Sequence, residues 1–118
     1  MAGVESKSMD APDEVRTPDK TRVDVVRVGG TEVGRFTLQP GWRWSECIKP
    51  VVGTDSCQVE HLGYAVSGRI GIAHDDGTNL EIARGDAYVI APGHEAWVVG
   101  DEPFVGVEFK SAGEYAKG

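Results

Sequence analysis

Turn-forming residues divide the chain at close intervals, and this spacing constrains the possible folds more than any other feature. Between the turns lie short runs of residues that favour strands, and no long segment repeats apolar residues at helical spacing. The turns are expected at Gly29-Gly30, residues 39–41, Asp76-Gly77, Pro92-Gly93 and residues 100–103. About eight short strands with evenly spaced turns are typical of antiparallel sandwiches and barrels. We therefore predict an all-β fold, a small antiparallel barrel without helices.

Length and composition favour a single barrel domain with two short flanking segments. The chain has 118 residues, of which 40% are hydrophobic, enough for one core. Residues 1–20 contain almost no large apolar side chain, so we predict a disordered N-terminal arm there. This arm either has no role or pairs with a neighbouring subunit. The barrel domain is expected over residues 21–110, followed by a C-terminal tail over residues 111–118.

The chain is acidic, with a formal net charge of −7 and a sequence isoelectric point of about 4.8. This charge argues against nucleic acids and anionic membrane surfaces as partners. No run reaches the roughly 18 apolar residues that a membrane span requires. The first ten residues lack the basic and apolar parts of a secretory signal. We therefore expect a cytoplasmic protein in which Cys47 and Cys57 are free thiols.

Two stretches, residues 53–68 and residues 85–97, combine metal-binding side chains with strand-forming runs. The first contains Asp55, Cys57 and His61, and the second contains His94. Thiolate, imidazole and carboxylate groups suit a divalent cation, zinc first and iron, nickel or copper less well. Each residue also has a purely structural alternative, as a capping side chain (Asp55), a buried thiol (Cys57), hydrogen-bonded barrel lining (His61) or a turn residue (His94).

The order of these features resembles a small single-domain cupin, and the resemblance covers residues 22–109. The first cupin motif is written G-x5-HxH-x3/4-E-x6-G, and Gly68 stands at its closing glycine. Counting back from Gly68 places His61 at the glutamate position. Counting further places Cys57 at the second histidine position and Asp55 at the first. The spacing of the motif is kept while each ligand type is changed.

The second cupin motif, G-x5-PxG-x2-H-x3-N, is matched in part. Gly85 and Gly93 occupy its glycine positions, Ala96 occupies its histidine position, and His94 lies two residues earlier on the same strand face. The resemblance implies a jelly-roll barrel in which this histidine and the thiol and imidazole of the first motif face one cavity. These three side chains would bind a divalent cation, with Asp55 as an optional or outer partner.

Aromatic residues are the candidates for the walls of a small-molecule pocket. Trp42 and Trp44 are expected on one face of a strand because a single residue separates them. Residues 48–54 are expected to form a loop. The full set of candidate pocket residues is Trp42, Trp44, Tyr64, Tyr88 and Trp97.

Three functions remain open at this point. The chain is a module that binds a small molecule in its barrel, a metal-dependent enzyme of dioxygenase or isomerase type, or a structural barrel without a metal. No nucleophile–base–acid set and no phosphate-binding glycine loop is visible, so we assign no catalytic residue. The apolar edge strands and the resemblance to cupins, which commonly pair through sheet edges, predict a homodimer.

Overall fold

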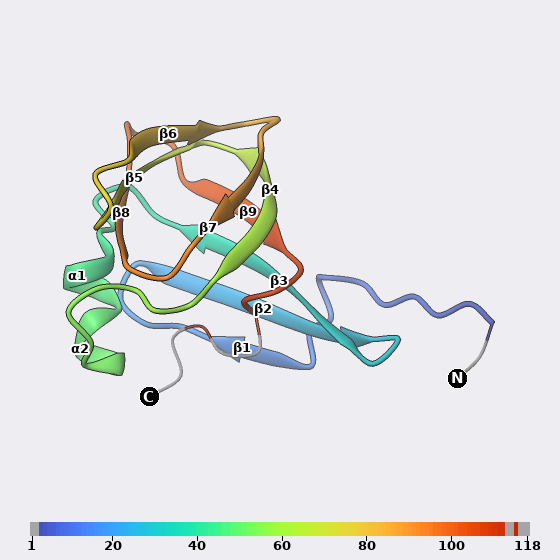
Figure 1. Ribbon diagram of the computed structural model, residues 1–118. Coiled ribbons are helices and arrows are strands. Elements are labelled where there is room, and N and C mark those ends of the chain that lie inside the picture. The colour runs from blue at the N-terminus through green and yellow to red at the C-terminus, as the bar shows by residue number, and fades with distance from the viewer. Residues whose placement is uncertain (1–2, 113–114, 116–118) are drawn as a thin grey trace.

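The computed structural model describes residues 3–112 and Tyr115, which form nine strands and two short helices (Figure 1). The helices are α1 Trp44–Cys47 and α2 Lys49–Val52. The strands are β1 Glu14–Arg16, β2 Thr21–Val28, β3 Thr31–Leu38, β4 His61–Ser67, β5 Arg69–His74, β6 Asn79–Ala83, β7 Ala87–Ile90, β8 His94–Val98 and β9 Phe104–Glu108. The predominance of strands confirms the predicted all-β class.

The strands form two antiparallel sheets. One has six strands in the order β1-β2-β3-β9-β4-β7, and the other has three strands in the order β6-β5-β8. Figure 1 shows the strands from β3 onward curled around a common interior, while β2 and β1 extend the larger sheet below it. This is the small antiparallel jelly-roll barrel that the sequence predicts.

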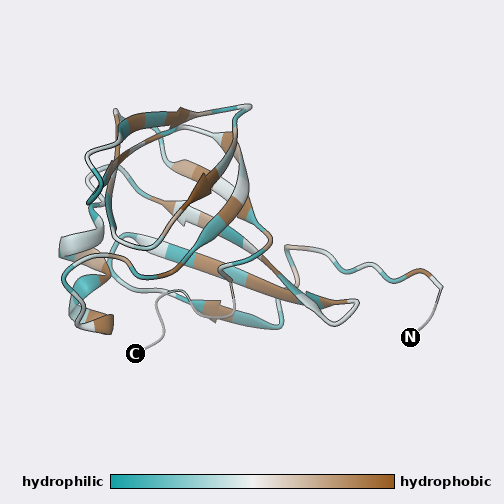
Figure 2. Ribbon diagram, in the orientation of Figure 1, coloured by the Kyte–Doolittle hydropathy of each residue, from teal (hydrophilic) through white to brown (hydrophobic). Residues whose placement is uncertain are grey.

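Side chains alternate between the interior and the outer surface along the strands that surround this interior. His61, Gly63 and Ala65 of β4 are buried, and the residues between them are exposed. Every second residue of β8 and of β9 is also buried. Figure 2 shows hydrophobic and hydrophilic residues interleaved along the strands, as expected for strands with one face in the core. The alternation therefore decides which side chains can reach the interior.

The turns follow the glycine signals of the sequence. Gly29 and Gly30 have φ angles of 58° and 76° and form the two-residue loop between β2 and β3. Gly68, between β4 and β5, has a φ angle of 75°, and a β-carbon there would lie 2.2 Å from the carbonyl oxygen of Pro103. Only glycine fits this close approach of two backbone segments.

Residues 44–52 differ from the prediction of a strand at Trp42 and Trp44 followed by a loop. They form α1 and α2, and both tryptophans are buried. Pro50 lies in the first turn of α2, where its missing N–H removes no helical hydrogen bond, and Gly53 ends the helix with a φ of 78°. Proline and glycine thus mark the two ends of a helix here. Within the part of the chain that the structure describes, no helix is long and apolar enough to cross a membrane.

The segments predicted as arm and tail contact the barrel and each other. Residues 14–16 pair with β2 as strand β1. Arg16 donates hydrogen bonds of 2.7 Å from Nη1 to the carbonyl oxygens of Ala112 and Tyr115, and both of these residues are buried. Residues 1–2 of the predicted arm and residues 113–114 and 116–118 of the predicted tail lie outside the described residues.

An uncharged surface covers the outside of β7, β4 and β9. Leu62 pairs with Val89, and Tyr64 pairs with Val107, so these side chains lie on adjacent strands. Strand β7 neighbours only β4 in the sheet, which makes it an edge strand, and Figure 2 shows it as hydrophobic. In a chain with 26% charged residues, such a surface is typical of a protein interface. We call it the outer apolar face, and its residues are Leu62, Tyr64, Val66, Val89, Val105 and Val107.

Replacing Arg16 with Ala should lower the free energy of unfolding by about 2–3 kcal/mol, because two buried carbonyl groups lose a charged donor. Urea denaturation measures the change. The matched control is Lys7→Ala, which removes an exposed ion pair with Asp13 in the same segment and should change stability by less than about 1 kcal/mol. Equally small changes in the two variants would contradict a structural role for the N-terminal segment.

We expect the predicted homodimer to form through the outer apolar face, since two copies would cover uncharged side chains with uncharged side chains. Light scattering at micromolar concentration should then give about twice the chain mass of 12.6 kDa. Val89→Glu should shift the protein toward the monomer because it places a carboxylate in the interface. Thr31→Glu, at the exposed start of β3, should leave the mass unchanged. A wild-type mass near 12.6 kDa would contradict the dimer.

Candidate metal centre

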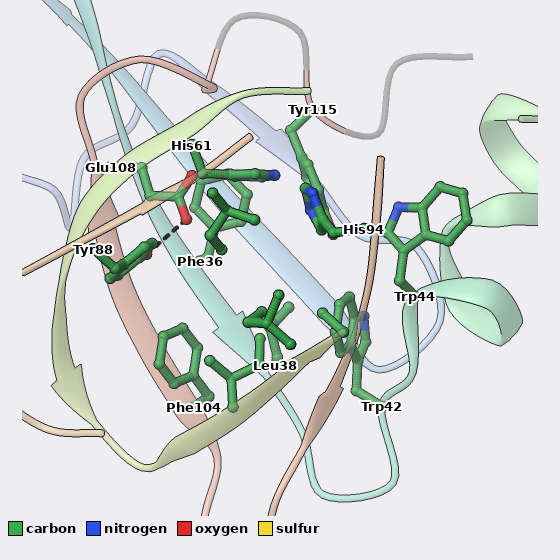
Figure 3. Close-up of a pocket in the computed structure, with 14 residues that line it drawn as sticks. Phe36, Leu38, Trp42, Trp44, His61, Tyr88, His94, Phe104, Glu108 and Tyr115 are labelled. Atoms are coloured by element: carbon green, nitrogen blue, oxygen red, sulfur yellow. Dashed lines mark hydrogen bonds and ion pairs between the residues drawn. The ribbon is translucent and has the colours of Figure 1, made fainter. Parts of the chain in front are cut away.

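A small cavity lies inside the barrel, with walls from both sheets. Its volume is about 30 Å³, room for about two water molecules or a ligand of similar size. Figure 3 shows His61, His94 and Glu108 at one end of the cavity, while Leu38, Trp42 and Phe104 lie toward the other. The aromatic residues of the walls are Phe36, Trp42, Trp44, Tyr88, Phe104 and Tyr115.

Backbone hydrogen bonds place Cys57 beside His94. Cys57 precedes β4 and forms an isolated antiparallel bridge with His94, the first residue of β8. The Cys57 amide donates to the His94 carbonyl oxygen at 2.9 Å, and the Gly93 amide donates to the Cys57 carbonyl oxygen at 2.7 Å. His61 follows as the first residue of β4 and points inward. Two stretches that are distant in sequence, residues 57–61 and the start of β8, thus present one thiol and two imidazoles to the same space.

The structure brings together three of the four predicted ligands. Cys57, His61 and His94 are all buried, and their ligand atoms lie within 4.8 Å of one another. A common point therefore lies within about 2.8 Å of all three atoms, slightly beyond the zinc bond lengths of about 2.0–2.3 Å. Cys57 Sγ and His61 Nε2 are 3.6 Å apart.

Both histidines are held through Nδ1. His61 Nδ1 donates to Glu108 Oε1 at 2.6 Å, and His94 Nδ1 donates to the Ala91 carbonyl oxygen at 2.8 Å. In each ring this leaves Nε2 as the nitrogen available to a cation. Metal-binding histidines commonly donate their other N–H to a carboxylate or a backbone carbonyl, which fixes the ring orientation.

Glu108 is a buried carboxylate that several elements share. It lies at the end of β9 and is 4% exposed. Tyr88 of β7 donates its hydroxyl to Glu108 Oε2 at 2.7 Å, and Ser111 donates its hydroxyl to Oε1. Burial raises the pKa of Tyr88, so this hydroxyl remains a donor. Together with His61, these groups satisfy a charge that would otherwise be costly to bury.

The charges of the group are strongly coupled. Burial disfavours the imidazolium, but Glu108 and the hydrogen bond with Cys57 outweigh it and raise the pKa of His61 to about 10. Burial also disfavours the thiolate, but hydrogen bonds from His61 and His94 outweigh it and lower the pKa of Cys57 to about 6. Burial opposes ionisation of Glu108, yet His61 holds its pKa below the usual value. At neutral pH the metal-free group therefore contains a thiolate, an imidazolium and a carboxylate.

This arrangement supports two kinds of chemistry. The thiolate and two imidazole nitrogens suit a borderline cation such as zinc. Cys57, His61 and Glu108 also form a nucleophile–base–acid set, in which the carboxylate orients the imidazole and the imidazole stabilises the thiolate. This set is not visible in the sequence, because Glu108 lies 47 residues after His61.

Asp55, the fourth predicted ligand, lies away from the cavity. Its side chain is fully exposed, and its carboxylate is 3.8 Å from the Lys49 ammonium group. The cupin spacing places this residue on the face of Cys57 only if the chain alternates as a strand. Residues 55–56 instead form a bend, so the alternation is lost before Cys57.

The predicted pocket aromatics fall into two groups. Trp42, Trp44 and Tyr88 line the cavity. Tyr64 is 48% exposed on the outside of β4, and Trp97 lies between the inward residues of β8. Strand alternation accounts for both corrections, because each of these side chains follows and precedes an inward residue.

Two important residues of the site were not predicted. Glu108 lies on the same face of the final strand as the apolar Phe104, because the two are four residues apart. This alternation could have indicated a buried carboxylate. Tyr115 packs against Phe36 and His61, with ring centroids 4.8 Å and 5.4 Å apart. Its position at the cavity depends on long-range contacts, so no local pattern identifies it.

No protein-family model and no curated protein matches the chain. Solved structures do match over most of its length. The cupin domain of Schizosaccharomyces pombe Cnp3 aligns with a TM-score of 0.60 and 12% identity, covering 90% of this chain and 73% of that one. A Klebsiella pneumoniae protein with a double-stranded β-helix domain aligns with a TM-score of 0.58 and 19% identity, covering 93% and 86%.

A larger enzyme also contains the same fold. The oxalate decarboxylase of Lactobacillus farciminis aligns with a TM-score of 0.57 and 19% identity, covering 84% of this chain and 31% of the enzyme. At these identities the similarity shows the shared fold, while function has to be argued from the site.

Cys57→Ser should change the pH dependence of stability in the metal-free protein. In the wild type, folding transfers a proton from Cys57 to His61, so this pair adds no net slope between about pH 6.5 and 9. In the variant only His61 titrates. Since Glu108 still raises the pKa of His61 in the folded variant, although the contribution of Cys57 is lost, the stabilisation is complete below about pH 6.5 and declines as the pH rises, by up to about 1.4 kcal/mol per pH unit.

Chemical denaturation with a chelator from pH 6 to 10 measures these profiles. Cys47→Ser is the matched control, because Cys47 is also a buried free cysteine but is not a member of the group. It should keep the wild-type profile. Identical profiles for the wild type and Cys57→Ser would contradict the thiolate–imidazolium pair.

Proposed function

We propose that this small cupin domain binds a divalent cation, zinc first, through Cys57, His61 and His94, and that the cation holds a small molecule in the barrel. The observation that carries the proposal is the convergence of one buried thiol and two buried imidazoles. Three protein ligands leave one position of a tetrahedral zinc site open, as in catalytic and ligand-binding zinc sites.

The distances support a tetrahedral site. Zinc bonds of about 2.3 Å to sulfur and about 2.0–2.1 Å to nitrogen separate the two ligand atoms by about 3.6 Å. Cys57 Sγ and His61 Nε2 are separated by that distance in the metal-free protein. The group as a whole spans at most 4.8 Å, so a movement of about 1 Å by the third side chain would complete the geometry.

The surroundings support a cation as well. His61 would lose its Nε2 proton on binding and keep the Nδ1–H bond to Glu108, while His94 would keep its bond to the Ala91 carbonyl. The Cys57 thiolate and the nearby Glu108 carboxylate would offset the two positive charges of the cation in a cavity with mostly apolar walls.

The ligand types decide between metals. Sulfur and nitrogen favour zinc, with iron, nickel and copper as alternatives, whereas magnesium and calcium require oxygen ligands. The converging group contains no carboxylate, and Asp55 lies at the surface. Hard cations are therefore disfavoured.

The cavity limits what the cation can hold. A volume of about 30 Å³, part of which the cation would occupy, favours a molecule of only a few non-hydrogen atoms. The structure of the oxalate decarboxylase similar in fold is a complex with formate, an anion of this size. We infer that the ligand of this chain is equally small, rather than an organic molecule surrounded by five aromatic residues.

A second candidate function is thiol chemistry without a metal. The contacts that favour it are Cys57 Sγ with His61 Nε2 at 3.6 Å and His61 Nδ1 with Glu108 at 2.6 Å. In this case Cys57 is the nucleophile and His61 the proton-transfer group. A zinc titration of the protein separates the two functions, since a nucleophilic Cys57 requires no cation.

His94→Ala should abolish stoichiometric zinc uptake while preserving the fold, because His94 Nδ1 bonds only a backbone carbonyl of the described residues. This variant is preferable to His61→Ala, which would leave the Glu108 carboxylate buried without its charged partner. Zinc titration followed by elemental analysis measures uptake, and circular dichroism measures folding. Wild type should bind one zinc per chain.

Two variants serve as matched controls. Asp55→Ala and His74→Ala remove a carboxylate and an imidazole that lie outside the converging group, so both should retain full zinc uptake. Cys57→Ser should weaken zinc and cadmium far more than manganese. Full zinc uptake by His94→Ala, or no uptake by wild type at millimolar zinc, would contradict the proposed site.

A further inference from the structure

The indole N–H of Trp44 is a buried hydrogen-bond donor without an acceptor among the described residues. The side chain is 2% exposed, and Nε1 has no hydrogen-bond partner in residues 3–112 or Tyr115. A buried donor left unpaired destabilises a protein, and buried tryptophan N–H groups usually have a partner. Packing of the core alone does not account for this group.

Trp44 forms part of the cavity wall. Figure 3 shows its nitrogen on the edge of the indole nearest to His94. Trp42 lines the same cavity, but its Nε1–H donates to Thr21 Oγ1 at 2.9 Å. The two indoles share burial and surroundings, and they differ in whether the N–H already has a protein acceptor. This difference singles out Trp44 as a donor available to a ligand.

We propose that Trp44 Nε1–H donates to a small oxygen-bearing monoanion, of the size of formate, bound in the cavity beside the cation. The inference rests on the proposed cation site, because the buried Glu108 carboxylate would repel an anion if no cation were present. The small volume of about 30 Å³ favours a small acid. Since the other walls are mostly apolar, the cation recognises the charge and Trp44 recognises an oxygen.

The test compares formate binding by zinc-loaded wild type, Trp44→Phe and Trp42→Phe. Calorimetry should show formate affinity weakened about tenfold or more in Trp44→Phe, which loses one hydrogen bond to an anion. Zinc affinity should be unchanged in that variant, because Trp44 is not a member of the converging group. Trp42→Phe is the matched control and should bind formate within about twofold of wild type, since its N–H is already used by Thr21.

A second readout uses the wild-type protein and does not depend on the folding of a variant. In ¹H–¹⁵N spectra of the zinc-loaded protein, formate should shift the indole resonance of Trp44 and leave that of Trp42 in place.

Each outcome bears on one part of the proposal. Unchanged formate affinity in Trp44→Phe, an unshifted Trp44 resonance at saturation, or no formate binding by zinc-loaded wild type would overturn the role of Trp44. Failure of wild type to take up zinc would overturn the cation site as well. Zinc titration in the absence of formate distinguishes these two failures.

Discussion

The buried charge of Glu108 is the constraint on which the rest of the site depends. A carboxylate in an apolar barrel is tolerated only when donors and a positive charge surround it. His61, Tyr88 and Ser111 provide these partners, and they come from β4, β7 and the segment after β9. The same bonds turn the His61 ring so that Nε2 faces Cys57. One buried charge therefore fixes both the geometry and the protonation of the candidate metal centre.

This constraint connects the ends of the chain to the cavity. Ser111 bonds Glu108, and Tyr115, four residues later, packs against the His61 ring. Arg16, in strand β1, donates a hydrogen bond from its guanidinium to the Tyr115 carbonyl oxygen. The barrel alone would leave His61 covered on fewer sides. Covering of the site thus relies on segments that composition alone marks as peripheral, and burial strengthens the electrostatic interactions within the site.

The sequence predicts the barrel and the three converging residues because both depend on local patterns. Turn glycines and strand alternation define the sheets, and motif spacing brings Cys57 near His61. Strand alternation, applied more strictly, would also have placed Tyr64 outside. Contacts between distant segments are different in kind. The approach of Glu108 to His61 and the packing of Tyr115 follow from tertiary structure. No local pattern in a single sequence indicates such contacts.

The central claim is that Cys57, His61 and His94 bind one cation inside the barrel, and a crystal structure of the protein grown with zinc tests it most directly. Anomalous diffraction at the zinc edge should give one peak within the cavity. Its bonds should measure about 2.3 Å to Cys57 Sγ and about 2.0–2.1 Å to Nε2 of each histidine. An empty cavity, or zinc found only at surface carboxylates, would contradict the account.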